Sequence, residues 1–139
     1  MIYALDTNIV IRYLRNTPSV QQHFDEAIIK GDGLVIPKVA DYEIRRGFRH
    51  KHTPNKEAAY NVLVSSNDWC DIAEMDDESW ERAEKVYTDL CRKGLSIGEL
   101  DILIAAFCLV NGYTIVTNNT RHFRYVDGLD VTDWTESDR

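Results

Sequence analysis

Short apolar runs typical of buried strands alternate along this chain with longer segments of helical periodicity. The runs are residues 1–5, 34–36, 69–73, 113–117 and 129–131. Helical patterns fill the first three intervals, and a polar loop over residues 118–122 leads to the last run. Because parallel strands need crossover connections that are usually helical, this order predicts an α/β fold. We expect a three-layer α/β/α sandwich around a mostly parallel sheet.

The segments between these runs carry apolar residues at helical spacing. The expected helices begin at residues 6–8, at 18, after 37, at about 57, at 76–79, and at 96 or 98. The last of these is almost wholly apolar from Ile102 to Val110, so we expect it to be deeply buried. The helix before it should run to about Arg92. Its inner face is expected to consist of Trp80, Ala83, Val86, Tyr87 and Leu90.

Length and composition indicate a single domain. With 139 residues, 44% of them hydrophobic, the chain is expected to fold as one unit over residues 1–139. Cys70, Cys91 and Cys108 are widely spaced and match no zinc-binding pattern, so we expect buried thiols in a reducing compartment. No signal peptide is evident, and no apolar run approaches the roughly 18 residues of a membrane span. We therefore expect a cytoplasmic protein without a membrane partner.

Acidic residues stand where short apolar runs end or helices begin. Asp6 follows the first run, Glu43 lies in the helical segment after the second, and Asp101 lies near the start of the apolar helix. If the strands are parallel, these positions converge at one edge of the sheet. Carboxylates gathered there repel one another unless a cation compensates them. Oxygen ligands without an organised His/Cys set favour Mg²⁺ or Mn²⁺, which points to metal-assisted phosphodiester chemistry.

Each of these acids also has a simpler interpretation. Asp6 can cap a helix, Glu43 can face solvent, and Glu99 can favour the helix N-terminus through its charge alone. Asp101 is harder to explain in this way, because an unpaired carboxylate beside an apolar helix is costly to bury.

The net charge of the chain and the local distribution of its charge point to different partners. A net charge of −7 weighs against a nucleic-acid partner. Directly after Glu43, however, the chain concentrates positive charge, which is what a phosphate backbone requires. The alternative is a solvated helix face that balances an acidic protein. The basic strip consists of Arg45, Arg46, Arg49, His50, Lys51, His52 and Lys56.

Four sequence pieces, in order, resemble the PIN domain family, and more narrowly its VapC-type toxin ribonucleases from VapBC toxin–antitoxin pairs. They are Leu5-Asp6-Thr7-Asn8-Ile9, Tyr42-Glu43-Ile44-Arg45-Arg46-Gly47, residues 97–106 (IGELDILIAA), and residues 116–123 (VTNNTRHF) with Gly128-Leu129 and Asp133-Trp134. The resemblance implies a five-stranded parallel sheet and an Mg²⁺- or Mn²⁺-dependent endoribonuclease. It further implies a homodimeric toxin that a small VapB-like antitoxin holds inactive.

The same resemblance assigns roles to residues. Asp6, Glu43 and Asp101 would be the catalytic metal ligands, with Glu99 and Asn119 as further ligand candidates. Supporting contacts would come from Thr7, Asn8, Thr117 and Asn118, and RNA contacts from Arg46 and Arg49. Many PIN domains place a fourth acid after the strand that here ends at Thr117, where this chain has Asn118, Asn119 and His122. An Asn carbonyl can ligate a hard cation but adds no charge, and His122 is more typical of a structural or solvated position.

Other function classes fit less well. A phosphoacceptor signalling domain also uses an acidic Mg²⁺ pocket, but it needs paired acids after the first strand and a late Lys. A haloacid-dehalogenase-type phosphatase needs a second acid where Asn8 stands. A catalytically silent PIN scaffold is the remaining alternative, and the intact Asp6, Glu43 and Asp101 weigh against it. The preferred prediction is hydrolysis of RNA by a metal-activated water. Transfer RNA is a frequent target in the family, but the sequence does not indicate which RNA this chain cleaves.

Overall fold

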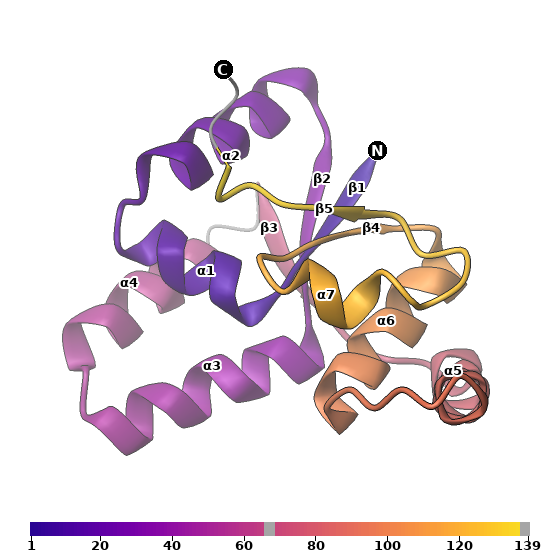
Figure 1. Cartoon of the computed structure of the whole chain (residues 1–139). Coiled ribbons are helices and arrows are strands. Elements are labelled where there is room, and N and C mark those ends of the chain that lie inside the picture. The colour runs from indigo at the N-terminus through magenta and orange to yellow at the C-terminus, as the bar shows by residue number, and fades with distance from the viewer. Residues whose placement is uncertain (66–68, 137–139) are drawn as a thin grey trace.

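A computed structural model describes residues 1–65 and 69–136 and shows a five-stranded, entirely parallel sheet in the order β3-β2-β1-β4-β5 (Figure 1). Helices cover both faces, so the predicted three-layer α/β/α sandwich is confirmed. The strands are β1 (Ile2–Leu5), β2 (Gly33–Pro37), β3 (Cys70–Ala73), β4 (Thr114–Val116) and β5 (Val131–Thr132). The helices are α1 (Thr7–Leu14), α2 (Pro18–Lys30), α3 (Lys38–Lys51), α4 (Pro54–Ser65), α5 (Asp77–Arg92), α6 (Glu99–Asn111) and α7 (Thr120–Phe123).

The first strand lies at the centre of the sheet, and the chain builds outward from it in two directions. Ala4 pairs with Val35 of β2 on one side and with Ile115 of β4 on the other. The strand order therefore reverses between β1 and β4, and the crevice beyond the carboxyl ends of such neighbouring strands is where open α/β sheets place their sites. Asp6 and Thr117 directly follow these two strands and are both buried.

The core lies between the sheet and the helices packed on it. Leu5, Ile36 and Ile115 contribute from the strands, and Phe24 and Ile104 from α2 and α6; all are at most 1% exposed. The apolar helix α6 is buried as expected over most of its length. In the described residues, no helix is long and apolar enough to cross a membrane.

Two boundaries near the C-terminus differ from the sequence prediction. Residues 118–122 were expected to form a loop, but α7 occupies Thr120–Phe123. Burial of the Phe123 ring draws this segment against the sheet edge, and a polar composition does not reveal that packing. The last strand is Val131–Thr132, shifted from the expected residues 129–131, because the amide of Thr117 donates to the carbonyl of Thr132.

Three side chains expected to be buried are exposed. Trp80 and Tyr87 of α5 are 51% and 52% exposed, whereas Ala83, Val86 and Leu90 are buried. At about 100° per residue, the two aromatic residues lie at the border of the apolar stripe, where the neighbouring α6 does not cover them. Cys91, on the solvent side of the same helix, is also exposed, so only Cys70 and Cys108 are buried thiols. Helix α4 begins at Pro54, earlier than expected, because proline suits a first helical turn.

Candidate functional site

Asp6 is the most enclosed acidic residue at the carboxyl edge of the sheet, with 2% of its surface exposed. Its Oδ1 accepts from the Thr7 amide at 2.8 Å. Its Oδ2 accepts from Asn8 Nδ2 at 2.9 Å and from Thr117 Oγ1 at 2.8 Å. The end of β1, the first turn of α1 and the end of β4 therefore hold one carboxylate in a fixed orientation.

The same neighbours extend the site to other segments. The Thr7 hydroxyl donates to Glu43 Oε1 at 3.0 Å and so connects α1 to α3. Asn8 Oδ1 accepts from the Asn118 amide, and Thr117 Oγ1 accepts from the Asn119 amide, both at 3.0 Å. Thr7, Asn8 and Thr117 therefore lie directly around the acids. Asn118 and Asn119 make these contacts through their backbone amides.

Asp101 reaches the site from the first turn of α6, where it is partly exposed. Its Oδ2 lies 2.9 Å from Nδ1 of His122 on α7. The sequence prediction treated this histidine as structural or solvated, but the short helix α7 brings it back to the carboxyl edge. The sequence did contain an indication of this position, because His122 follows Thr117 by only five residues after the end of β4.

The charges of Asp6, Glu43 and Asp101 influence one another, although the three residues come from different segments of the chain. Burial raises the pKa of Asp6, and the charge of Asp101 raises it further against the opposing hydrogen bonds. Burial also raises the pKa of Glu43, and the charges of Asp6 and Asp101 add to that effect. Arg46 lowers the pKa of Glu43 and is therefore the cation that acts on this acid. The sheet thus assembles carboxylates that repel one another.

Two predicted contributors, Glu99 and Arg49, are exposed. Glu99, at the start of α6, acts electrostatically on Tyr87 of α5. On α3, Arg46 lies over the Tyr42 ring at 5.0 Å and is close enough to Glu43 to lower the pKa of that acid.

The donor chemistry suits a hard cation, but the side chains do not form a closed cage. Within residues 1–65 and 69–136, no three carboxylate, imidazole or thiol groups are grouped closely enough to hold a metal ion. The donors that Asp6, Glu43 and Asp101 offer are carboxylate oxygens, and the imidazole of His122 lies beside Asp101. An ion at this edge would need water or substrate oxygens to complete its shell, as Mg²⁺ usually does.

A second buried acid, Asp41, was missed by the sequence prediction. It accepts from Tyr60 Oη at 2.7 Å, from Arg45 Nε at 2.9 Å and from Lys38 Nζ at 3.3 Å. Arg45 also donates to Asn61, so this network joins α3 to α4 and takes one member out of the expected basic strip. The spacing of Lys38, Asp41 and Arg45 at three and four residues is the signal that could have revealed it.

Comparison with known proteins places the chain among relatives of the same length. The model of the PIN domain family matches residues 3–129. The tRNA(fMet)-specific endonuclease VapC of Shigella flexneri is 31% identical over 96% of this chain and 98% of its own length. Ribonuclease VapC2 of Rickettsia felis is 27% identical with the same coverage. The crystal structure of VapBC2 from Rickettsia felis, bound to a promoter DNA fragment, contains a chain with a TM-score of 0.87 at 25% identity, covering 96% of this chain and 99% of that one.

Proposed function

Because the chain belongs to the PIN domain family, and within it to the VapC-type ribonucleases, we propose that it is a metal-dependent endoribonuclease. The observation that carries this proposal is the convergence of Asp6, Glu43 and Asp101 at the reversal point of the sheet. Burial raises the pKa values of Asp6 and Glu43, and the charges of the neighbouring acids raise them further. A bound divalent cation would relieve the repulsion among these charges and would in turn attract the phosphate of an RNA substrate.

The residues around the acids support distinct tasks in such an enzyme. Asp6, Glu43 and Asp101 would hold Mg²⁺ or Mn²⁺, which when bound lowers the pKa of water and stabilises charge on the phosphate. Asn8 and Thr117 hold Asp6, and the Thr7 hydroxyl holds Glu43. His122 holds Asp101 through Nδ1. These contacts reduce the motion of each carboxylate before substrate arrives, which is the usual contribution of residues behind a ligand.

A cleavage assay with the purified protein tests the proposal. We expect RNA cutting with Mg²⁺ or Mn²⁺ and none in excess EDTA. The Asp101→Asn variant should be folded by circular dichroism but inactive. Activity that persists in EDTA would refute metal dependence. A folded wild-type protein that cuts no RNA under any metal condition would instead favour a catalytically silent PIN scaffold.

Transfer RNA is the substrate to test first. The relatives from Shigella flexneri and Salmonella typhimurium are both named tRNA(fMet)-specific endonucleases. We therefore propose cleavage of a tRNA and expect a comparison of initiator tRNA with bulk tRNA and ribosomal RNA to reveal preferential cutting of one species. Equal degradation of all these RNAs would contradict a specific tRNA substrate.

Control by a small antitoxin follows from the same similarities. The solved relatives from Rickettsia felis, Haemophilus influenzae and Salmonella typhimurium are VapBC complexes. An arginine from a VapB-like partner would pair with the acidic site, since its planar donor fork matches carboxylates. An apolar partner helix would lie near Tyr13, where Val62 and Trp69 are 70% and 52% exposed. Co-purification of a small chain that is lost from a Val62→Asp variant would support this arrangement.

We also propose a homodimer. Trp80 and Tyr87 stay half exposed on α5 beside a shallow depression that α5 and α6 share. Such aromatic side chains are typical anchors of protein interfaces. Light scattering should give twice the chain mass of 16.0 kDa, and a Trp80→Ser, Tyr87→Ser variant should give the monomer. An unchanged dimer in that variant would exclude this surface.

A further inference from the structure

A pocket of about 170 Å³ opens beside Glu43, between α1, α3 and the start of α4. In Figure 1 these three helices lie together on the side of the molecule away from α5. Thr7 and Glu43, which share a hydrogen bond in the acidic site, form one wall of the pocket. The pocket is therefore continuous with the place where the phosphodiester would be cut.

The floor of this pocket is apolar. It consists of Ile11, Ile44 and Phe48, and the Phe48 ring packs at 5.7 Å from the Tyr60 ring. Such a floor accepts the face of a flat, weakly polar group but does not replace the hydration of a phosphate. The volume is below the roughly 300–1,000 Å³ of pockets for drug-sized ligands. One planar ring system is therefore the right size of occupant.

The rim of the pocket is basic. Arg15 reaches it from the end of α1, Lys51 from the end of α3, and Lys56 from the first turns of α4. In the described part of the chain, none of these three has an ion pair with an Asp or Glu, unlike Arg45, which binds Asp41. The gathering of three cations at the rim of one pocket, in a chain of net charge −7, favours an anionic ligand there.

We propose that this pocket binds one unpaired nucleotide of the RNA next to the cleaved bond. The base lies on the floor of Ile11, Ile44 and Phe48, and the adjoining phosphates lie against Arg15, Lys51 and Lys56. The inference rests on the proposed ribonuclease function, because the pocket opens onto Glu43. A base enters such a pocket only when it is unstacked and unpaired, so the substrate class is a loop or single-stranded segment.

Gly47 allows the pocket to be closed without disturbing the helix. It lies in the interior of α3, lines the pocket, and a Cβ added there meets no heavy atom within 4 Å. Glycine is a poor helix former, so its replacement should leave the helix as stable or more stable. A Gly47→Leu side chain has open space at the pocket wall and should exclude the base. Ala58→Leu, on an exposed position of α4 outside the pocket lining, adds a similar apolar side chain as a control.

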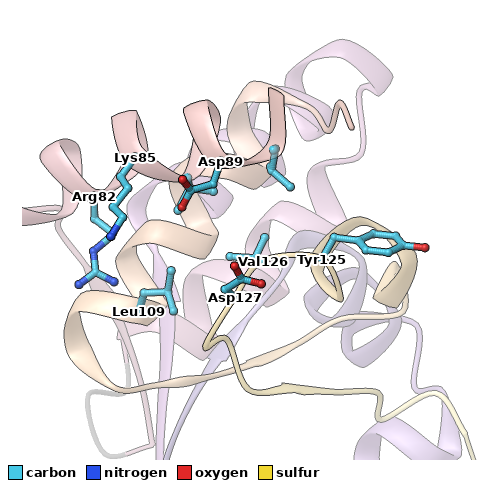
Figure 2. Close-up of a pocket in the computed structure, with 9 residues that line it drawn as sticks. Arg82, Lys85, Asp89, Leu109, Tyr125, Val126 and Asp127 are labelled. Carbon is cyan, nitrogen blue, oxygen red and sulfur yellow. The ribbon is translucent and has the colours of Figure 1, made fainter. Parts of the chain in front are cut away.

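A different pocket supplies the matched charge control. It lies between α5, α6 and the loop after α7 (Figure 2), and its residue from α6 is Leu109, near the opposite end of that helix from Asp101. Arg82 and Lys85 line it together with Asp89 and Asp127, so it carries both signs of charge. Lys93 already donates to Asp127 at 2.9 Å. Lys30, exposed at the end of α2, supplies a third cation outside the proposed subsite. The Lys30→Gln, Arg82→Gln, Lys85→Gln variant therefore removes three positive charges away from that subsite.

The first experiment measures anisotropy of a fluorescein-labelled 12-nucleotide single-stranded RNA in EDTA, with a gel to confirm that the RNA stays intact. A fully paired duplex of the same sequence is the second probe. Gly47→Leu should weaken single-strand binding at least about tenfold, as expected for loss of one bound base, with an undiminished melting temperature. Ala58→Leu should bind like wild type. Duplex binding should be weaker than single-strand binding and insensitive to Gly47→Leu.

The second experiment follows the salt dependence of single-strand binding. The Arg15→Gln, Lys51→Gln, Lys56→Gln variant should reduce the slope of log K against log salt by about 2, since each phosphate contact on a single strand contributes about 0.7. The control on Lys30, Arg82 and Lys85 has the same net charge and should keep the wild-type slope. Equal effects of the two triple variants would mean general electrostatics and would overturn the subsite.

The experiments distinguish a failure of the nucleotide subsite from a failure of the ribonuclease function. If wild type cuts RNA but Gly47→Leu and the rim variant bind and cut like wild type, the subsite is wrong and the ribonuclease stands. If wild type neither binds nor cuts RNA, the ribonuclease proposal fails and the subsite fails with it. If Gly47→Leu loses a co-purifying small chain but keeps RNA binding, the pocket belongs to a protein partner and the nucleotide assignment is overturned.

Discussion

Two buried aspartates of this protein differ in their partners and not in their burial. Asp6 is 2% exposed and Asp41 is 1% exposed. Asp41 lies among Lys38, Arg45 and the Tyr60 hydroxyl, so its charge is compensated by side chains of the same chain. In the described part of the chain, Asp6 receives hydrogen bonds from the neutral groups of Thr7, Asn8 and Thr117 and has no ion pair, and the charge of Asp101 raises the electrostatic cost of its own. A buried acid that the fold itself neutralises stabilises structure, whereas one that it leaves uncompensated is available for a ligand.

The largest expected effect separates the two aspartates by activity. Asp6→Asn should reduce RNA cleavage about 100-fold or more, since a positioned charge at the reacting phosphate is lost. Its thermal stability should be equal to or higher than that of wild type, because a repelled buried charge is removed. Cleavage rates beside circular dichroism melts provide the measurement. Glu99→Gln, the same kind of change at an exposed acid, is the control, and full activity in Asp6→Asn would refute the site.

The reverse effect is expected at Asp41. Asp41→Ala should lower the free energy of unfolding by about 2 kcal/mol, because Tyr60 loses its acceptor and Arg45 loses its ion pair. This value is below the range for fully buried pairs, since Lys38 and Arg45 can turn to solvent. Urea denaturation gives the value, and cleavage well below the melting temperature should stay close to wild type. A stable but inactive variant would mean that Asp41 belongs to the active site.

The pH dependence of stability should report the environment of Asp6. Burial raises the pKa of Asp6 above its ordinary value, so the folded protein binds the proton more tightly than the unfolded chain. Stability contributed by the protonated carboxyl is therefore present at low pH and is lost as the pH rises through the folded pKa. The stability of Asp6→Asn relative to wild type should increase between about pH 4 and pH 7. Melting curves across this range, recorded in EDTA, test it. A constant difference would contradict the raised pKa.

The smallest expected effect is metal-induced stabilisation. Without RNA, Mg²⁺ at about ten times its dissociation constant should stabilise wild type by about 1.4 kcal/mol. Asp6→Asn should gain less, and Asp41→Asn should gain as much as wild type. Differential scanning calorimetry with and without Mg²⁺ gives the shift, and KCl at equal ionic strength is the control for non-specific salt effects. An identical shift in all variants would argue against binding at Asp6.

Several features of the fold were predictable because they depend on local pattern. The alternation of apolar runs with helical segments identified all five strands and the parallel sheet. Thr7, Asn8 and Thr117 were expected near Asp6 from the resemblance, and the structure places them in hydrogen-bond contact with it. Strand and helix ends were less predictable. Helix α7 and the shifted β5 depend on the burial of Phe123 and on hydrogen bonds across the sheet, which no local pattern records.

The sequence by itself determined the alternating architecture, the placement of Asp6 and Asp101 at element ends, and the placement of Glu43 in the helix after β2, because periodicity and chain order specify them. Tertiary structure decided which charges find partners. It joined Asp41 to Tyr60 across two helices, brought His122 to Asp101, and turned Glu99 toward α5. These outcomes depend on which helix faces lie against each other. Pairing between residues distant in the chain is set by packing of the whole domain, and local propensity contains no record of it.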